Sequence, residues 1–147
     1  MVAVQESPVE FGEKREGTAY QPRPGAYAVI FDLDVVAVLQ TRQGYFLPGG
    51  GLDRGESPES GLHREVREEI GYSIAILRPL GFAIENVFAA GEGYFSKQCY
   101  FFAARLVKKV SKPSEADHEL IWLPLPVAIR RLTHQSQSWA ASLIRKP

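Results

Sequence analysis

Apolar residues occur in short runs separated by polar or glycine-containing turns, a pattern typical of a strand-rich domain. The runs at residues 26–31 and 35–39 flank Asp32-Leu33-Asp34 and predict a β-hairpin with a short turn. Further strands are expected at residues 45–47, 73–82, 98–107 and 120–123. The segment between the strands at 73–82 and 98–107 predicts a hairpin or loop, with a glycine-rich tip at 89–94.

A helical period replaces the strand pattern at residues 58–70. Leu62, Val66 and Ile70 recur every four residues and form one apolar stripe. Ser57 suits the N-cap, and Gly71 suits the position that follows the last turn. The sequence therefore specifies both ends of this helix.

Strands on both sides of this helix, followed by expected helices at 126–132 and 137–144, predict an α/β sandwich with a mixed sheet between helical layers. A length of 147 residues is typical of one domain with its own core, so we interpret residues 1–147 as a single domain. Residues 1–23 are rich in charge and proline, and both a loose tail and a short edge strand fit them.

The composition and net charge of the chain exclude several classes of function. The 17 basic and 17 acidic residues give a net charge of zero without long blocks of one sign, so no footprint for general nucleic-acid binding is present. The single cysteine, Cys99, excludes an internal disulfide. The N-terminus lacks the pattern of a signal peptide and no apolar run is long enough to span a membrane, so we expect a cytoplasmic protein without membrane partners.

Three glutamates of the 58–70 helix carry the candidate chemistry. At about 100° of rotation per residue, Glu65, Glu68 and Glu69 share one face, beside the apolar stripe. Neighbouring carboxylates repel one another, so a hard cation is the natural compensation. Magnesium favours carboxylates together with substrate phosphates, and manganese suits the same ligands. The competing interpretation is a solvated acidic face.

Glycines precede this helix and interrupt it. Residues 49–51 are three consecutive glycines, which we interpret as a turn whose main chain can approach a ligand and whose carbonyl oxygens can face a metal. Gly61 lies on the same side as the glutamates. Room for a metal or phosphate and close packing both explain a glycine there.

The stretch from Gly50 to Tyr72 resembles the Nudix box, G-x5-E-x7-R-E-U-x-E-E-x-G-U. Every fixed position is matched, by Gly50, Glu56, Arg64, Glu65, Glu68, Glu69 and Gly71. Val66 satisfies the first aliphatic position, whereas Tyr72 stands where the family usually has an aliphatic residue. On this resemblance we identify the chain as a member of the Nudix (MutT-like) hydrolase family, with the Nudix-type α/β/α sandwich.

The resemblance implies magnesium-dependent hydrolysis of a nucleoside diphosphate linked to another moiety. It assigns metal binding to Glu65, Glu68, Glu69 and Gly50, and catalysis to the three glutamates, one of which can serve as base instead. It also implies an ion pair between Glu56 and Arg64 that ties the loop to the helix. The expected partner is a small nucleotide rather than a nucleic acid, and the sequence is compatible with a homodimer.

Substrate contacts are expected from Arg42 and Phe46, and by resemblance from the loop carboxylate Glu115. Arg23 is a further candidate for the phosphates, and the aromatic candidates for the base are Tyr27, Phe46, Phe88, Tyr94, Phe95 and Trp139. His63 receives no catalytic role, and His118 and His134 are expected to be ordinary surface residues.

Alternative functions remain open at this level. An NDP-sugar, ADP-ribose or a modified NTP each fits the resemblance as a substrate. A catalytically silent, nucleotide-binding regulatory module is the main alternative. Isomerisation of an isoprenoid diphosphate and removal of an RNA cap are the others, and the neutral charge argues against the last.

Overall fold

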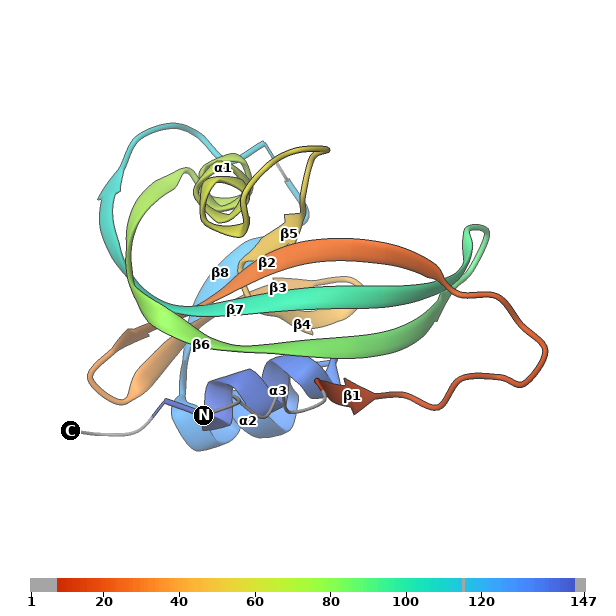
Figure 1. Ribbon diagram of the computed structural model, residues 1–147. Helices are drawn as coiled ribbons and strands as arrows, with labels where there is room; N and C mark the ends of the chain where they lie inside the picture. Colours follow the sequence, from red (N-terminus) through yellow and green to blue (C-terminus); the bar gives the residue numbers. More distant parts are fainter. Residues whose placement is uncertain (1–7, 115, 145–147) are drawn as a thin grey trace, which may run out of the picture.

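The computed structural model describes residues 8–114 and 116–144, and its sheet is sandwiched between helices on both faces. Along the chain follow β1 (Val9–Phe11), β2 (Gln21–Asp32), β3 (Val35–Thr41), β4 (Gly44–Phe46), β5 (Gly49–Gly51), α1 (Pro58–Ile70), β6 (Tyr72–Ala89), β7 (Gly93–Lys109), β8 (Glu119–Pro124), α2 (Leu125–Arg131) and α3 (Gln135–Ser142). Helix α1 covers one face, and α2 and α3 cover the other (Figure 1).

The sheet is mixed. Its main order is β1-β6-β7-β2-β3-β4, with β5 paired to β2 and β8 paired to β3. Strands β1 and β6 are parallel, as are β2 and β7, whereas the other pairs are antiparallel. The expected α/β sandwich with a mixed sheet between helices is therefore confirmed.

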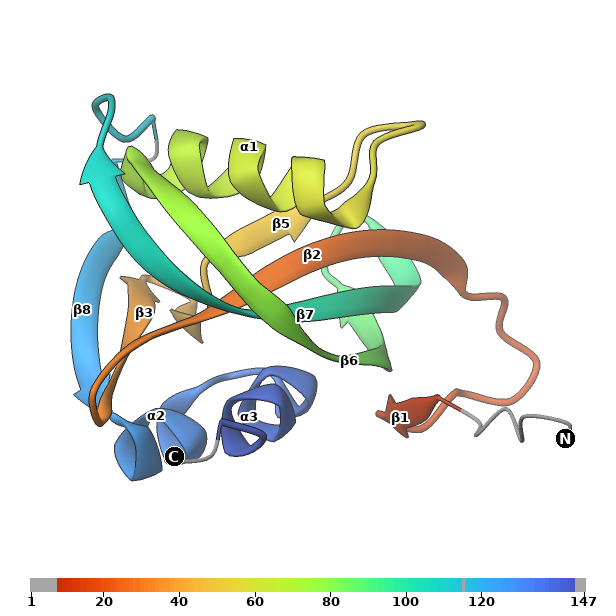
Figure 2. The ribbon, with the colours of Figure 1, turned by 60° about the vertical axis from the view of Figure 1, so that its left-hand side comes forward.

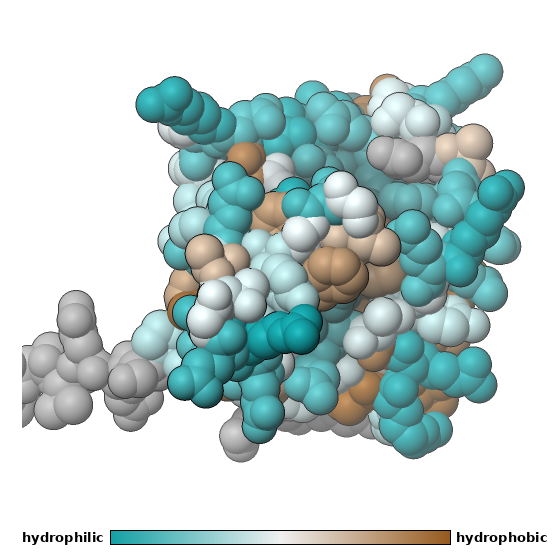
Figure 3. Space-filling model, turned by 90° about the vertical axis from the view of Figure 1, so that its right-hand side faces the viewer, coloured by the Kyte–Doolittle hydropathy of each residue, from teal (hydrophilic) through white to brown (hydrophobic). Residues whose placement is uncertain are grey.

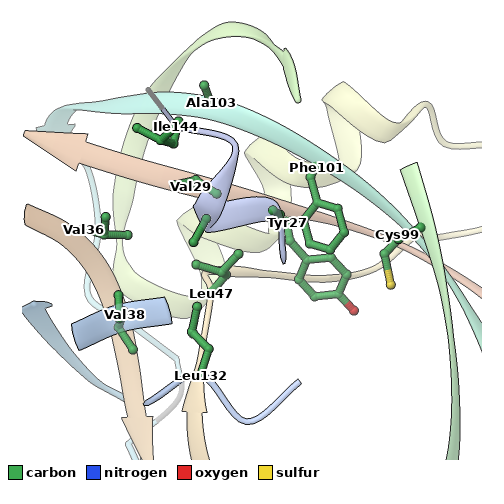
Figure 4. Packing of buried hydrophobic residues seen from close by; sticks show 14 residues of the cluster. Tyr27, Val29, Val36, Val38, Leu47, Cys99, Phe101, Ala103, Leu132 and Ile144 are labelled. Carbon is green, nitrogen blue, oxygen red and sulfur yellow. The ribbon is translucent and has the colours of Figure 1, made fainter. Parts of the chain in front are cut away.

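Strand β2 separates two apolar cores because its side chains alternate between the faces of the sheet. Ala26, Ala28 and Ile30 pack in the cluster that contains the buried stripe of α1. Tyr27 and Val29 belong to the opposite cluster, between the sheet and helices α2 and α3, which Figure 4 shows from close by. The glutamates of α1 are thus held on a helix whose other side is anchored in a core.

The β2–β3 hairpin and the bounds of α1 are confirmed. The glycine run at 49–51 was expected as a turn, which is wrong: it forms β5, antiparallel to β2. Strands β6 and β7 pair from Tyr72↔Lys109 to Ala89↔Gly93, well beyond the expected ranges. Of the two expectations for the segment between these ranges, a hairpin or a loop, the hairpin is confirmed.

The opening segment contributes a short edge strand. Strand β1 runs parallel to β6, and β2 begins at Gln21, while residues 1–7 lie outside the described part of the chain. Strand β1 pairs with residues 83–85 of β6, and Figure 2 shows it on the side of the molecule away from α1. In the described residues, no helix combines the length and the apolar character needed to cross a membrane.

Asn86 of β6 holds this opening segment in place. It is buried, and its Nδ2 donates hydrogen bonds to Glu10 Oε2 (3.0 Å) and to the carbonyl oxygen of Gly12 (2.9 Å). The hydroxyl of Ser96 in turn donates to Asn86 Oδ1. One buried amide therefore links β1, β6 and β7.

We predict that Asn86→Ala lowers the free energy of unfolding by about 1–3 kcal/mol, because it leaves buried partners without hydrogen bonds. Chemical denaturation measures this change, and hydrogen exchange should show faster exchange in β1. Gln98→Ala on β7 is the control, since the Gln98 side chain makes no hydrogen bond within the described residues. Equal stability of Asn86→Ala and the native chain would contradict the assignment.

Candidate active site

The ends of α1 are fixed by the residues that the sequence singles out. The hydroxyl of Ser57 accepts a hydrogen bond from the Ser60 N–H at 3.1 Å, and Pro58 occupies the first turn. Gly71 adopts the left-handed conformation, with φ of 75°, and its N–H donates a hydrogen bond to the Arg67 carbonyl oxygen. The helix thus begins and ends at defined points, which sets the positions of its glutamates.

Arg64 is the centre of a dense polar network beside α1. Its Nε and Nη2 donate to both oxygens of Glu56, each at 2.8 Å, and Nη2 also donates to the Gly51 carbonyl oxygen at 3.0 Å. Its Nη1 reaches Glu65 at 3.0 Å and Glu68 at 3.3 Å. The ion pair between Glu56 and Arg64 is therefore present, and the same guanidinium contacts two of the box glutamates.

These contacts change the acidity of both partners. The hydrogen bonds from Arg64, followed by that from the Asp53 N–H, lower the pKa of Glu56 to about 2. The hydrogen bond to Glu56 in turn raises the pKa of Arg64. Both groups are charged at neutral pH, so the loop before α1 is tied to the helix by a permanent ion pair.

Glu69 has a different environment from the other two glutamates. Its Oε1 accepts a hydrogen bond from the Gly49 N–H at 2.9 Å, and its Oε2 lies 3.3 Å from His118 Nδ1. Its side chain is only 12% exposed, whereas that of Glu68 is 54% exposed. Glu69 therefore links α1 to β5 and to the loop that precedes β8.

The donor set fits a divalent cation. Glu65, Glu68 and Glu69 supply carboxylate oxygens from one helix, and the bare α-carbon of Gly50 leaves the space that the Glu65 carboxylate occupies, since a Cβ there would overlap it. Burial raises the pKa of Glu65, a cost that a bound cation would offset. In the side-chain arrangement seen here, residues 8–114 and 116–144 contain no cluster of three metal-ligating side chains. Glu65 and Glu68 contact Arg64, and Glu69 contacts the Gly49 N–H.

Gly61 is explained by packing. A Cβ at this position would overlap the side chain of Leu52 and approach the Glu56 carboxylate. Of the two explanations, the structure therefore supports close packing, and the packed group is the loop before α1. The glycine allows the Glu56–Arg64 pair to lie against the helix.

A pocket of about 260 Å³ opens beside Glu69. The residues that line it come from segments far apart in the sequence. The lining consists of Tyr27, Leu39, Thr41, Gln43, Phe46, Leu47, Gly49, Gly50, Glu69, Lys97, Asp117, His118, His134 and Gln137. Of the box residues, Gly50 and Glu69 reach it, together with Gly49 directly before the box, so the acidic helix face and a ligand-sized cavity adjoin each other.

The other expected substrate contacts fall in different places. Phe46 lines the pocket, and so does the aromatic candidate Tyr27. The Arg42 side chain is 91% exposed and pairs at 3.3 Å with Asp117, which does line the pocket, so a role for Arg42 stays a prediction. Glu115 lies outside the described residues, and its role stays a prediction too.

Arg23 and several aromatic candidates belong to the end of the molecule that carries the β6–β7 turn. Arg23 stacks on the Phe95 ring at 3.6 Å and pairs with Glu92, and Phe88 is 62% exposed there. On this face, apolar atoms gather near the centre and polar atoms surround them (Figure 3). None of these side chains lines the pocket.

The expectation for His118 and His134 is wrong, because both are half-buried and line the pocket. His134 Nδ1 lies 3.1 Å from Glu85 Oε2, and the Ser136 N–H donates to Glu85 Oε1 at 2.8 Å. Although burial alone would raise it, these hydrogen bonds lower the pKa of Glu85 to about 2. Sequence reasoning missed Glu85, Lys97, His118, His134 and Gln137 because they lie singly in unrelated segments.

Comparison with known proteins identifies the family to which this architecture belongs. The family model of the NUDIX domain matches residues 21–146. An acidic, arginine-bridged helix after a glycine strand, set on this α/β sandwich, defines a protein of the Nudix class. The chain belongs to the Nudix family, whose members typically depend on a divalent metal.

Individual relatives are similar but distant. The 8-oxo-(d)GTP phosphatase of Mycolicibacterium smegmatis is 30% identical over 88 residues, which are 60% of this chain and 26% of that protein, so the chain spans about a quarter of its length. A NUDIX hydrolase from Nitrosomonas europaea superposes with a TM-score of 0.69 at 19% identity, over 84% of this chain and 88% of that one. An ADP-ribose pyrophosphatase from Streptococcus suis gives 0.60 at 21% identity, over 82% and 90%.

We predict that Arg64→Ala lowers Tm at neutral pH and reduces activity by about tenfold or more, because Glu56 loses its partner and Glu65 and Glu68 lose their common donor. Because the pKa of Glu56 falls from 4.5 to about 2 on folding, its stabilisation is present above pH 4.5 and lost as the pH drops toward 2. The stability of the variant should therefore decline less over this range.

Thermal melting at a series of pH values measures this difference. Arg67→Ala is the matched control, because Arg67 is an exposed arginine of the same helix. Unchanged melting of Arg64→Ala at pH 7, relative to the control, would refute the structural role of the ion pair.

Proposed function

We propose that this chain is a magnesium-dependent Nudix pyrophosphohydrolase that cleaves a nucleoside diphosphate linked to another moiety. The observation that carries the proposal is the adjacency of the acidic face of α1 and the pocket, through Glu69, Gly49 and Gly50. Family membership and an intact box support it. A small nucleotide is the proposed partner, and the cytoplasm the proposed location.

Each residue of the site has its own role in the proposed reaction. Glu65, Glu68 and Glu69, with the Gly50 carbonyl, would hold the cation, and the three carboxylates share the roles of metal ligand and general base. A bound magnesium or manganese ion would neutralise phosphate charge and lower the pKa of an attacking water. Arg64 orients Glu65 and Glu68, and the Gly49 N–H fixes Glu69 at the edge of the pocket.

The substrate is an oxidised or otherwise modified NTP, an NDP-sugar or ADP-ribose. The distant relatives named above include an 8-oxo-(d)GTP phosphatase and an ADP-ribose pyrophosphatase, so both types of substrate occur among proteins similar to this chain. A regulatory module without turnover is the competing proposal. The complete set of box glutamates favours the enzyme.

We predict that one member of a substrate panel is cleaved only in the presence of magnesium. The panel contains NDP-sugars, ADP-ribose, dinucleoside polyphosphates, canonical and oxidised NTPs, and capped RNA, and product release is measured with and without the metal. Glu69→Gln should reduce the rate by about 100-fold or more, because it removes a charge that the metal and the attacking water need.

Glu59→Gln is the matched control, since Glu59 is an exposed glutamate of the first turn of α1, at a variable position of the box. Its rate should equal that of the native chain. Full activity of a well-folded Glu69→Gln would sink the role given to Glu69. If no member of the panel is cleaved while nucleotide binding is still detectable, the regulatory module is favoured instead.

A further inference from the structure

Several polar residues of the pocket lie outside the Nudix box, and three of them form what we call the recognition group: Lys97 of β7, His134 before α3, and Gln137 of α3. Aromatic rings accompany them. Lys97 Nζ lies 5.3 Å from the centroid of the Tyr27 ring, and the Phe46 and His134 rings lie 5.4 Å apart. Polar groups set among flat rings are suited to a nucleobase.

Gln137 has only one part of its amide available to a ligand. Its Oε1 accepts a hydrogen bond from the Leu47 N–H at 2.8 Å, and because an N–H requires an acceptor, this contact fixes the orientation of the amide. Within residues 8–114 and 116–144, the amide nitrogen makes no hydrogen bond. Gln137 therefore offers the pocket a donor.

Lys97 offers donors as well. Its side chain lies in the pocket wall, and in the part of the chain that the structure describes its ammonium group makes neither a hydrogen bond nor an ion pair. Glu85, its neighbour across the β6–β7 ladder, is engaged by His134 and Ser136. Burial lowers the pKa of Lys97, so its ammonium is poorly hydrated and would gain from a ligand acceptor.

His134 is oriented in the same way. The ionised Glu85 accepts the Nδ1–H, so the Nε2 side of the ring is the one left for a ligand. The recognition group as a whole thus presents two donors, Lys97 and Gln137, in fixed positions. Acceptor oxygens on a ligand complement them, whereas an amino group would place donor against donor.

Nucleobases differ in this feature. Guanine presents the O6 and N7 acceptors and uracil, like thymine, presents O4, whereas adenine and cytosine carry an amino group at the corresponding position. We propose that Lys97 and Gln137 select nucleotides with a keto base, guanine or uracil, over those with an amino base. This proposal rests on the proposed function for the identity of the ligand as a nucleotide.

Binding of nucleoside monophosphates, measured by calorimetry, tests the proposal without turnover. GMP is compared with the ribonucleotide of 2-aminopurine, which lacks O6, and UMP is compared with CMP. The keto member of each pair should bind about tenfold or more tightly, the difference expected for one hydrogen bond to a charged donor. Equal binding within both pairs would overturn the proposal.

Lys97→Met keeps the length of the side chain and removes the donors. It should abolish most of the preference for GMP over the 2-aminopurine nucleotide, while the latter binds as before. Lys109→Met, at an exposed position of the same strand, is the control and should change neither. An equal loss for every nucleotide would instead assign Lys97 to the phosphate or ribose and overturn the base-reading role.

Gln137→Glu provides a second, independent variant. It retains an oxygen for the Leu47 N–H and removes the amide donor, so we expect weaker GMP binding, with melting and circular dichroism confirming the fold. Unchanged GMP binding would remove Gln137 from the proposal. Since these measurements need no hydrolysis, a base preference without turnover would contradict the proposed enzyme alone, and turnover without base preference would contradict this inference alone.

Discussion

The arrangement of the acidic helix depends on one guanidinium. Three carboxylates within five residues of a helix would repel one another, and Arg64 counters this by contacting Glu65 and Glu68 while it pairs with both oxygens of Glu56. Because the guanidinium is planar, a single side chain serves the loop and the helix face at once. Lysine has no comparable fork of donors, so the box requires arginine here for geometric reasons as well as for charge.

A second constraint is that the main chain of β5 must lie very close to its neighbours. A Cβ at Gly49 would overlap the backbone of β2, and one at Gly50 would overlap the Glu65 carboxylate. Only glycine permits both contacts, and at Gly49 it also permits a φ of 140°. The glycine run therefore does two things: it extends the sheet beside β2, and it brings the Gly49 N–H to Glu69.

The sequence predicts the local features well and the assembled pocket poorly. Caps and periodicity define α1 to the residue, because Ser57 and Gly71 act on their own helix. The segment between the expected strands at 73–82 and 98–107 was left open as a hairpin or a loop, because its order comes from the pairing of β6 with β7, which the sequence of one strand does not record. Lys97 and Gln137 lie 40 positions apart and meet only through the sheet and the packing of α3, so no spacing rule could have joined them.

Contacts of Glu85 and Glu69 connect the recognition group to the acidic helix. Glu85 accepts the Ser136 N–H at the start of α3, where the helix dipole favours a negative charge, and this fixes the position of Gln137. Gln137 in turn accepts a hydrogen bond from the Leu47 N–H. Two residues further along the chain, the Gly49 N–H donates a hydrogen bond to Glu69. A ligand that engages Gln137, as proposed above, would therefore act on the same short stretch of main chain that positions Glu69.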